Sequence, residues 1–240
     1  QVLTLDVLLQ GNAVTLPLTL YDANSASFDV QPGGELLSGY NGVFVSQERN
    51  GAILEVIAGG APTRLAGGTI GTLEDRRREI ATRQQDVAGL NVTRKVFVPR
   101  DGYFARYLEV LSNPTADPIT VDLRVTSHVQ GYTPSTQVMA TSSGDAVVSV
   151  ADPDSADRWV TIDDADTDPT VAFSLPSLAF AFDGAGAPER VASAEFRNVS
   201  YCPYYCYQTG DLVYQWSQVV VPPGGTVAYM HFVAQLDRRA

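Results

Sequence analysis

Apolar and polar residues alternate along most of this chain. Around position 123, Val121, Leu123 and Val125 fall on one side of the alternation, while Asp122 and Arg124 fall on the other. Successive side chains of a β-strand point to opposite faces, so this pattern is typical of a strand with one face buried and the other in water. Comparable strands are expected at 2–9, 13–21, 43–47, 52–57, 90–98, 103–112, 146–150, 159–163, 178–182, 212–221 and 226–236.

Turn residues separate these segments, and helix signals are scarce. Asn50-Gly51 lies between the expected strands at 43–47 and 52–57 and predicts a hairpin. The polar stretch 72–86 contains helix-forming residues but no apolar stripe at three- and four-residue spacing, so we expect a loop and an edge strand there. The sequence therefore predicts an all-β fold: a large antiparallel β-sandwich of two sheets, formed by residues 1–240 as one domain.

Composition excludes several classes of protein. Apolar residues make up 45% of the 240 positions and charged residues 18%, which is too apolar and too weakly charged for a disordered chain. The formal net charge is −11, and with no basic patch expected, the sequence argues against nucleic acid as a partner. No stretch approaches the roughly 20 apolar residues of a membrane helix, so we expect no membrane insertion.

The chain ends suggest that these residues are part of something longer. The sequence begins at Gln1, with no basic and then apolar signal segment after it. The last expected strand is followed directly by Leu236-Asp-Arg-Arg-Ala240. We therefore expect a fragment or a processed piece of a longer secreted protein.

Two stretches resemble a known family. The first reads GLNVTRKVFVP (89–99) and GYFARYLEVLSN (102–113), and the second reads YQWSQVVVPPGGT (214–226) and YMHF (229–232). Together they resemble the "supersandwich" domains of the galactose-mutarotase-like superfamily. Such domains occur as N-terminal β-domains of glycoside hydrolases and phosphorylases, and as modules of large secreted bacterial proteins. The resemblance implies a mutarotase-like sandwich; the motifs are structural rather than catalytic.

Two histidines are the first candidates for chemistry. Mutarotase-like enzymes are known for histidines that work with a glutamate in acid–base catalysis at the sugar ring. His231 lies between Met230 and Phe232 in a strand that is apolar on both faces, and we expect a core position. His128 follows an alternating strand and has no local link to a glutamate. Glu109 is expected on the solvated face of the strand at 103–112, and no catalytic residue is assigned.

A cluster of aspartates is the candidate metal site. Asp164, Asp166 and Asp168 copy the first half of a calcium-binding loop, since hard cations prefer carboxylate oxygens. The second half departs from that pattern, because Pro169 and Leu175 stand where glycine and glutamate are needed. Solvated turns between short strands are the preferred interpretation, and a structural calcium ion is the alternative. No other cofactor is expected.

The segment 201–207 is the candidate recognition loop. It holds both cysteines of the chain, Cys202 and Cys206, whose spacing does not match a redox motif. A local disulfide is the first choice in an extracellular protein, with free thiols and a metal site as alternatives. The loop also carries four tyrosines, whose flat faces and hydroxyl tips suit sugars and protein interfaces. They are Tyr201, Tyr204, Tyr205 and Tyr207.

These observations favour a binding module over an enzyme. Our first hypothesis is a non-catalytic extracellular or cell-surface module that binds carbohydrate or another protein, or that self-assembles as the subunit of a surface structure or filament. The expected partners are therefore carbohydrate, other protein subunits or further copies of the chain. The alternative is the β-domain of a carbohydrate-active enzyme: a glycoside hydrolase, a phosphorylase or a mutarotase-like enzyme. A histidine beside a glutamate in a cleft would favour that alternative.

Overall fold

The structure is a computed structural model. It describes residues 12–39, 44, 50–130, 136–152, 154–163, 177–201 and 207–236, and of residues 200, 201, 207 and 208 the backbone alone. Its strands are β1 (Ala13–Thr15), β2 (Leu18–Tyr21), β3 (Ser27–Val30), β4 (Ile53–Ala58), β5 (Ala61–Arg64), β6 (Ile70–Glu74), β7 (Glu79–Val87), β8 (Leu90–Phe97), β9 (Phe104–Ser112), β10 (Ile119–Val129), β11 (Gln137–Thr141), β12 (Trp159–Asp163), β13 (Ser177–Ala181), β14 (Ser193–Tyr201), β15 (Tyr207–Val221) and β16 (Thr226–Leu236). Within this part of the chain, no helix is long and apolar enough to cross a membrane.

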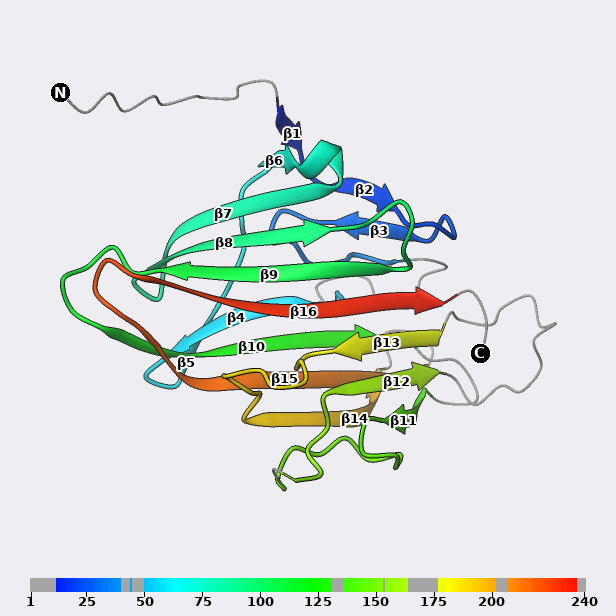
Figure 1. The fold of residues 1–240 in the computed structure, drawn as a ribbon. Helices are drawn as coiled ribbons and strands as arrows, with labels where there is room; N and C mark the ends of the chain where they lie inside the picture. The colour runs from blue at the N-terminus through cyan, green and yellow to red at the C-terminus, as the bar shows by residue number, and fades with distance from the viewer. Residues whose placement is uncertain are drawn as a thin grey trace.

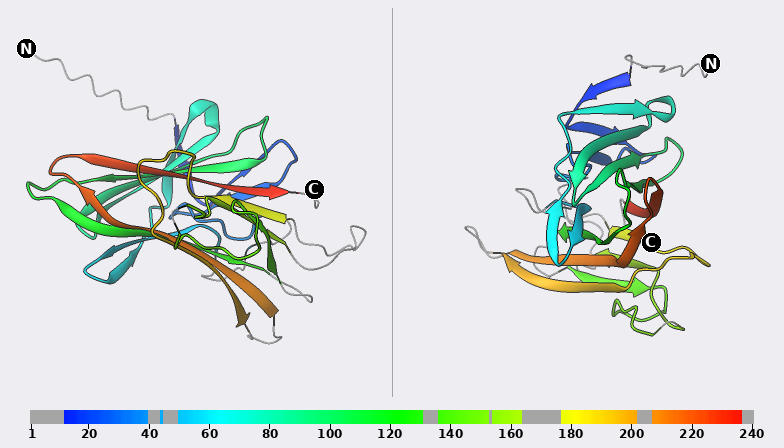
Figure 2. Two further views of the ribbon diagram at one scale, coloured as in Figure 1. Left: turned by 60° about the horizontal axis from the view of Figure 1, so that its bottom comes forward. Right: turned by 90° about the vertical axis from the view of Figure 1, so that its left-hand side faces the viewer.

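The described strands form two main antiparallel sheets. One has nine strands in the order β1-β6-β7-β8-β9-β16-β13-β12-β11, and the other has five in the order β14-β15-β10-β4-β5; β2 and β3 form a separate pair. The ribbon shows β7, β8, β9 and β16 in one layer and β4, β10, β15 and β14 in the other (Figure 1). Two further views show the same layers from other sides (Figure 2). The predicted all-β antiparallel sandwich is confirmed.

The period-two pattern decides which side chains enter the core. In β10, Leu123 and Val125 are fully buried, whereas Arg124 and Thr126 are half-buried on the outer face. In β8, Val92 and Val96 alternate in the same way with more exposed neighbours. Each fully buried aliphatic side chain stabilises the fold by about 1.5–3 kcal/mol relative to an exposed one. The core therefore lies between the inner faces of the two sheets.

The hairpin predicted around Asn50-Gly51 is wrong for β4. β4 pairs with β10 on one edge and with β5 on the other. Gly51 is instead bridged to Leu36, and Phe44 is bridged to Val129 of β10. Residues 45–49 lie outside the described part. The pairing of β4 with a strand more than 60 residues away in sequence has overridden the local turn signal.

The stretch 72–86 forms most of β6, a short 3₁₀ turn, η3 (Asp75–Arg77), and nearly all of β7. β7 is not an edge strand, because it pairs with both β6 and β8. Its charged residues Glu79 and Arg83 lie on the outer face of the sheet, where they form ion pairs with residues of the neighbouring strands. Glu74 pairs with Arg83 and Lys95, and Glu79 pairs with Lys95.

The strand expected at 146–150 is also wrong. Those residues form an irregular loop in which the Asp157 carboxylate accepts hydrogen bonds from the backbone N–H groups of Ser143 and Ser149, at 3.0 and 2.9 Å. These hydrogen bonds lower the pKa of Asp157, against a desolvation that is the largest single influence and acts to raise it. Side-chain hydrogen bonding has here replaced a strand ladder.

Candidate functional site

The two histidines lie in different environments, and the buried one is not accessible to a ligand. His231 of β16 and Glu109 of β9 are both fully buried, with 2.8 Å between His231 Nε2 and Glu109 Oε1. The Tyr214 hydroxyl of β15 lies 2.8 Å from His231 Nδ1, so this group joins the two sheets. The prediction of a core position for His231 is confirmed. The solvated position expected for Glu109 is wrong.

A neutral imidazole fits this buried environment. Burial, as the largest influence, lowers the pKa of His231 below its usual range, although Glu109 acts in the opposite direction. A neutral ring has one donor and one acceptor nitrogen, so Nε2–H donates to Glu109 and Nδ1 accepts from the Tyr214 hydroxyl. Burial also raises the pKa of the Tyr214 phenol, so that it stays protonated as a donor.

Glu109 owes its buried position to a buried arginine. Arg94 of β8 stands directly opposite Glu109 in the ladder, and its Nε lies 3.0 Å from Glu109 Oε1. The guanidinium also lies over the ring of Tyr107, with 4.5 Å between Cζ and the ring centroid. An unpaired buried charge costs several kcal/mol, so each charge requires the other. This cluster stabilises the core and offers no surface to a substrate.

The outer face of the five-stranded sheet carries a different, accessible polar group. Its groove of about 510 Å³ crosses β14, β15, β10, β4 and β5. His128 is on the groove floor, with 2.7 Å between its Nδ1 and Oδ1 of Asp211. Arg197 of β14 is opposite Asp211 in the ladder, so the three side chains form one row across three strands. This is the only histidine in a groove among the described residues.

A second row crosses the same groove four residues further along each strand. It contains Ser193, Gln215, Arg124, Glu55 and Arg64, in that order across five strands. Two nitrogens of Arg124 lie within 2.9 Å of Glu55 Oε2. Gln215 Nε2 donates to Asp122 Oδ2 over 3.1 Å. Charged and amide groups are therefore held in fixed orientations on an open sheet face.

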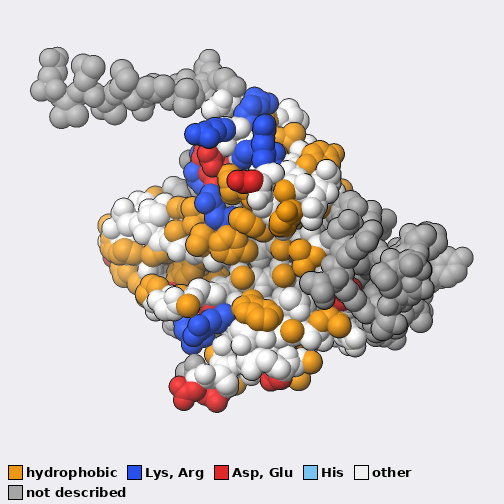
Figure 3. All heavy atoms as spheres, turned by 45° about the vertical axis from the view of Figure 1, so that its right-hand side comes forward, with side chains coloured by type: hydrophobic (Ala, Val, Ile, Leu, Met, Phe, Trp, Pro, Cys, Tyr) orange, Lys and Arg blue, Asp and Glu red, His pale blue; other side chains and the backbone are white. Residues whose placement is uncertain are grey.

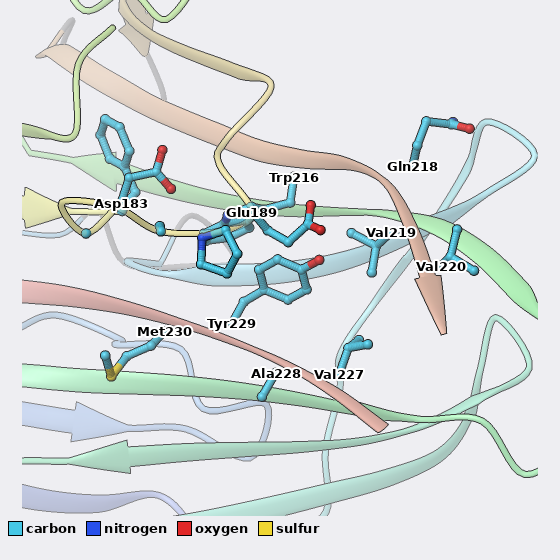
Figure 4. A pocket seen from close by; sticks show the side chains of 14 residues that line it. Asp183, Glu189, Trp216, Gln218, Val219, Val220, Val227, Ala228, Tyr229 and Met230 are labelled. Atoms are coloured by element: carbon cyan, nitrogen blue, oxygen red, sulfur yellow. The ribbon is translucent and has the colours of Figure 1, made fainter. Parts of the chain in front are cut away.

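A second hollow lies where β15 and β16 approach the connection after β13. It measures about 420 Å³, and aromatic and apolar side chains line most of it (Figure 4). Trp216 and Tyr229 lie 5.1 Å apart between ring centroids. Burial, and then the negative charge of Glu189, raise the pKa of the Tyr229 phenol. This hollow lacks the paired rows of polar groups found in the groove.

Most of the residues predicted for binding lie outside the described part of the chain. These are Tyr204, Tyr205, Cys202, Cys206, Asp164, Asp166 and Asp168. Of Tyr201 and Tyr207 only the backbone is described, and the two residues pair at the end of the β14–β15 hairpin. Where the chain is described, no three His, Cys, Asp or Glu side chains lie close enough to hold a metal ion.

Sequence reasoning missed Glu55, Arg124 and Asp211 as candidates for a site. The signal was the alternation around Leu123, which already placed Arg124 on the water-facing side of a strand. The local sequence does not show which strands lie beside the one that carries Arg124. Glu55 and Arg124 are 69 residues apart in the sequence, and His128 and Asp211 are 83 residues apart.

Solved structures share this architecture. A proposed aldose 1-epimerase of Escherichia coli K12 has 9% identity and a TM-score of 0.60, over 93% of this chain and 99% of that chain. A galactose mutarotase-like protein of Lactobacillus casei has 9% identity and a TM-score of 0.53, over 91% and 100%. A mutant of the heparan sulfate lyase HepC of Pedobacter heparinus has 11% identity and a TM-score of 0.51, over 90% of this chain and 30% of that chain.

No protein-family model matches the chain, and no curated protein matches it in sequence. At the identities found, the likeness to solved structures shows the fold alone. That fold is the galactose mutarotase-like β-sandwich, as the resemblance of the two sequence stretches implied.

Proposed function

From its galactose mutarotase-like fold and the groove on its five-stranded sheet, we propose that this chain is a non-catalytic carbohydrate-binding module of a secreted or cell-surface protein. The observation that carries the proposal is the set of paired polar rows on an open sheet face. The sugar lies across β14, β15, β10 and β4. It contacts Arg124, Glu55, His128 and Asp211.

The chemistry of these rows suits a sugar. Arginine, carboxylate and amide groups are planar and form paired hydrogen bonds with neighbouring hydroxyls. Because Arg124 is held by Glu55 and His128 by Asp211, binding does not have to fix their rotamers. The aldose 1-epimerase and mutarotase-like descriptions of the E. coli and L. casei proteins support a sugar as the ligand class.

A glycan screen followed by calorimetry tests this proposal. We expect Arg124→Gln to weaken binding of the best oligosaccharide at least tenfold, because the variant removes a charged donor from the groove floor. Arg83→Gln is the matched control, since Arg83 forms an exposed ion pair with Glu74 on the other sheet. Unchanged affinity in Arg124→Gln, or loss only in the Glu189→Gln variant of the second hollow, would contradict the proposal.

A second candidate function rests on the pair of His128 and Asp211. The Asp211 carboxylate at Nδ1 orients the imidazole so that Nε2 can transfer a proton. Mutarotation of an aldose proceeds by such proton transfers to and from the sugar. In this alternative the groove is an active site. Polarimetry of freshly dissolved aldoses distinguishes the two: acceleration by the wild type and not by His128→Gln would favour the enzyme, and no acceleration would favour the binding module.

A further inference from the structure

The link between β6 and β7 has an unusual backbone. Asp75, Arg76 and Arg77 all have positive φ angles, of 40°, 53° and 67°. Positive φ is disfavoured for residues with a Cβ atom, and three in succession without a glycine or asparagine are rarer still. Strain of this kind persists where surrounding structure enforces it, and it concentrates at ligand-binding sites.

This strained turn presents arginines that lack ion-pair partners. Within the described part of the chain, neither Arg76 nor Arg77 of the turn forms an ion pair, and neither does Arg100 of the β8–β9 connection. By contrast, Arg83 and Arg106 nearby pair with glutamates. Lys and Arg side chains gather at the end of the molecule that carries β1, β6 and β7 (Figure 3). The expectation that the chain has no basic patch is therefore wrong.

A hollow lies beside the turn. It measures about 460 Å³ and is lined by Arg76, Arg78, Arg100, Phe97 and Pro99, together with Asp75 and Asp101. Arg78 is held in place because its Nε donates to the Val98 carbonyl over 2.6 Å. Burial, and then the positive charge of Arg100, lower the pKa of Arg78. Guanidinium groups of like charge therefore meet at a hollow whose aromatic and proline surfaces are apolar.

We propose that this hollow binds one carboxylate or sulfate group of an anionic polysaccharide. An oxyanion offers acceptor oxygens to Arg76 and Arg100 and relieves their mutual repulsion with Arg78. Phe97 and Pro99 offer apolar surface to the sugar ring that carries the anion. This site is separate from the groove, since it lies on the nine-stranded sheet.

A flexible polysaccharide fits this place better than DNA or a membrane. The whole chain carries a net charge of −11, which repels an extended anionic surface. Arg76, Arg77 and Arg100, which form no ion pair in the described part of the chain, lie on one turn and one loop. A flexible chain can bring a single charged group into the hollow while the rest stays in solvent.

Calorimetry with two anionic probes and a neutral control tests this site. The probes are heparin-derived and polygalacturonate oligosaccharides, which separate sulfate from carboxylate, and the control is dextran oligosaccharide. We expect binding of at least one anionic probe, weaker at high salt, and none of dextran. Arg76→Gln and Arg100→Gln should each weaken binding at least fivefold. Arg83→Gln, which removes the same charge from an existing ion pair, should change it less than twofold.

The outcomes against the proposal are distinct. Absence of binding, or equal weakening in Arg76→Gln and Arg83→Gln, would overturn it, because the second result means that net charge alone is sensed. Tighter binding of duplex DNA or of vesicles containing anionic lipid than of either oligosaccharide would overturn the choice of ligand.

The thermal stability of a glycine variant provides a second test of the strained turn. Arg76→Gly removes the side chain and suits a φ of 53°, so we expect the melting temperature to rise by about 2–4 °C while anion binding is lost. A lower melting temperature together with unchanged binding would contradict a turn held under strain for its arginines.

Discussion

The imidazole of His231 and the carboxylate of Glu109 lie 2.8 Å apart, and both side chains are completely buried. A histidine beside a glutamate was the arrangement that would favour a catalytic site in a cleft. Here the pair lies between the sheets, with Tyr214 on one side and Arg94 on the other. The accessible histidine, His128, lies instead beside an aspartate on the outer face of the smaller sheet.

The first prediction concerns the buried charges. Glu109→Gln leaves the guanidinium of Arg94 without its counter-charge, so we expect a loss of about 3–5 kcal/mol in the free energy of unfolding. Urea unfolding measures this loss of free energy. Glu195→Gln is the control, because Glu195 and Arg197 are both more than half exposed and their pair should contribute less than about 1 kcal/mol. Equal effects of the two variants would contradict the role given to the buried cluster.

The second prediction concerns pH. The folded protein lowers the pKa of His231 below its value of about 6.5 in the unfolded chain, chiefly through burial. The unfolded state therefore binds a proton below pH 6.5 that the folded state does not. Stability from this group is fully present above pH 6.5, and is lost as the pH falls, by up to about 1.4 kcal/mol per pH unit.

The measurement compares urea unfolding at pH 7.5 and 5.5 in the wild type and in His231→Gln. We expect the difference in unfolding free energy between the two pH values to be smaller in the variant. Carboxylates contribute little to this comparison, since their usual pKa values lie near 4. A pH dependence identical in both proteins would show that His231 does not titrate as described.

The third prediction concerns the glycine that covers Arg94. A Cβ atom added to Gly34 would lie 2.6 Å from Arg94 Cδ, and the φ of Gly34 is +78°. We expect Gly34→Ala to destabilise the fold by about 1–3 kcal/mol more than Gly224→Ala. Gly224 has a similar φ of +63° but nothing within 4 Å of the added atom. Gly224→Ala therefore measures the cost of a positive φ alone, without a steric clash. Thermal unfolding of both variants measures this difference. Equal losses of stability would mean that the Arg94 side chain moves aside without cost.

The fourth prediction keeps the binding experiment interpretable. The pair of Arg124 and Glu55 is partly exposed, with 32% and 22% of the side-chain surface accessible, so we expect its net contribution to stability to be at most about 1 kcal/mol. Arg124→Gln should therefore unfold within a few degrees of the wild type. A cooperative transition shifted by more than about 10 °C would mean that this arginine serves the fold rather than a ligand.

The sequence predicted strands well where one face is apolar, as in β10 and β12, because alternation follows directly from the geometry of a strand. It failed at Glu109. The alternation from Tyr107 to Leu111 places Glu109 in the core, but a charge there makes sense only with Arg94 opposite, which is a matter of register between strands. The left-handed turn at Arg76 gave no signal either, because no glycine marks it.

The candidate groove could be predicted only in part. Arg124 could be placed on an outer face from its own strand, but the groove needs β4 and β14 as neighbours, and those pairings join distant parts of the sequence. The predictions for the tyrosine loop, the disulfide between Cys202 and Cys206, and the calcium ion at Asp164, Asp166 and Asp168 concern side chains that the structure does not describe, and they stay predictions.

Whether a sugar binds in the groove of the five-stranded sheet can be tested by titrating isotope-labelled protein with the tightest-binding oligosaccharide from the glycan screen and following the amide chemical shifts. We expect the shifts to cluster on β4, β10, β14 and β15, around Glu55, Arg124 and Asp211. Shifts confined to the hollow around Trp216 and Tyr229, or none at saturating oligosaccharide, would contradict this expectation.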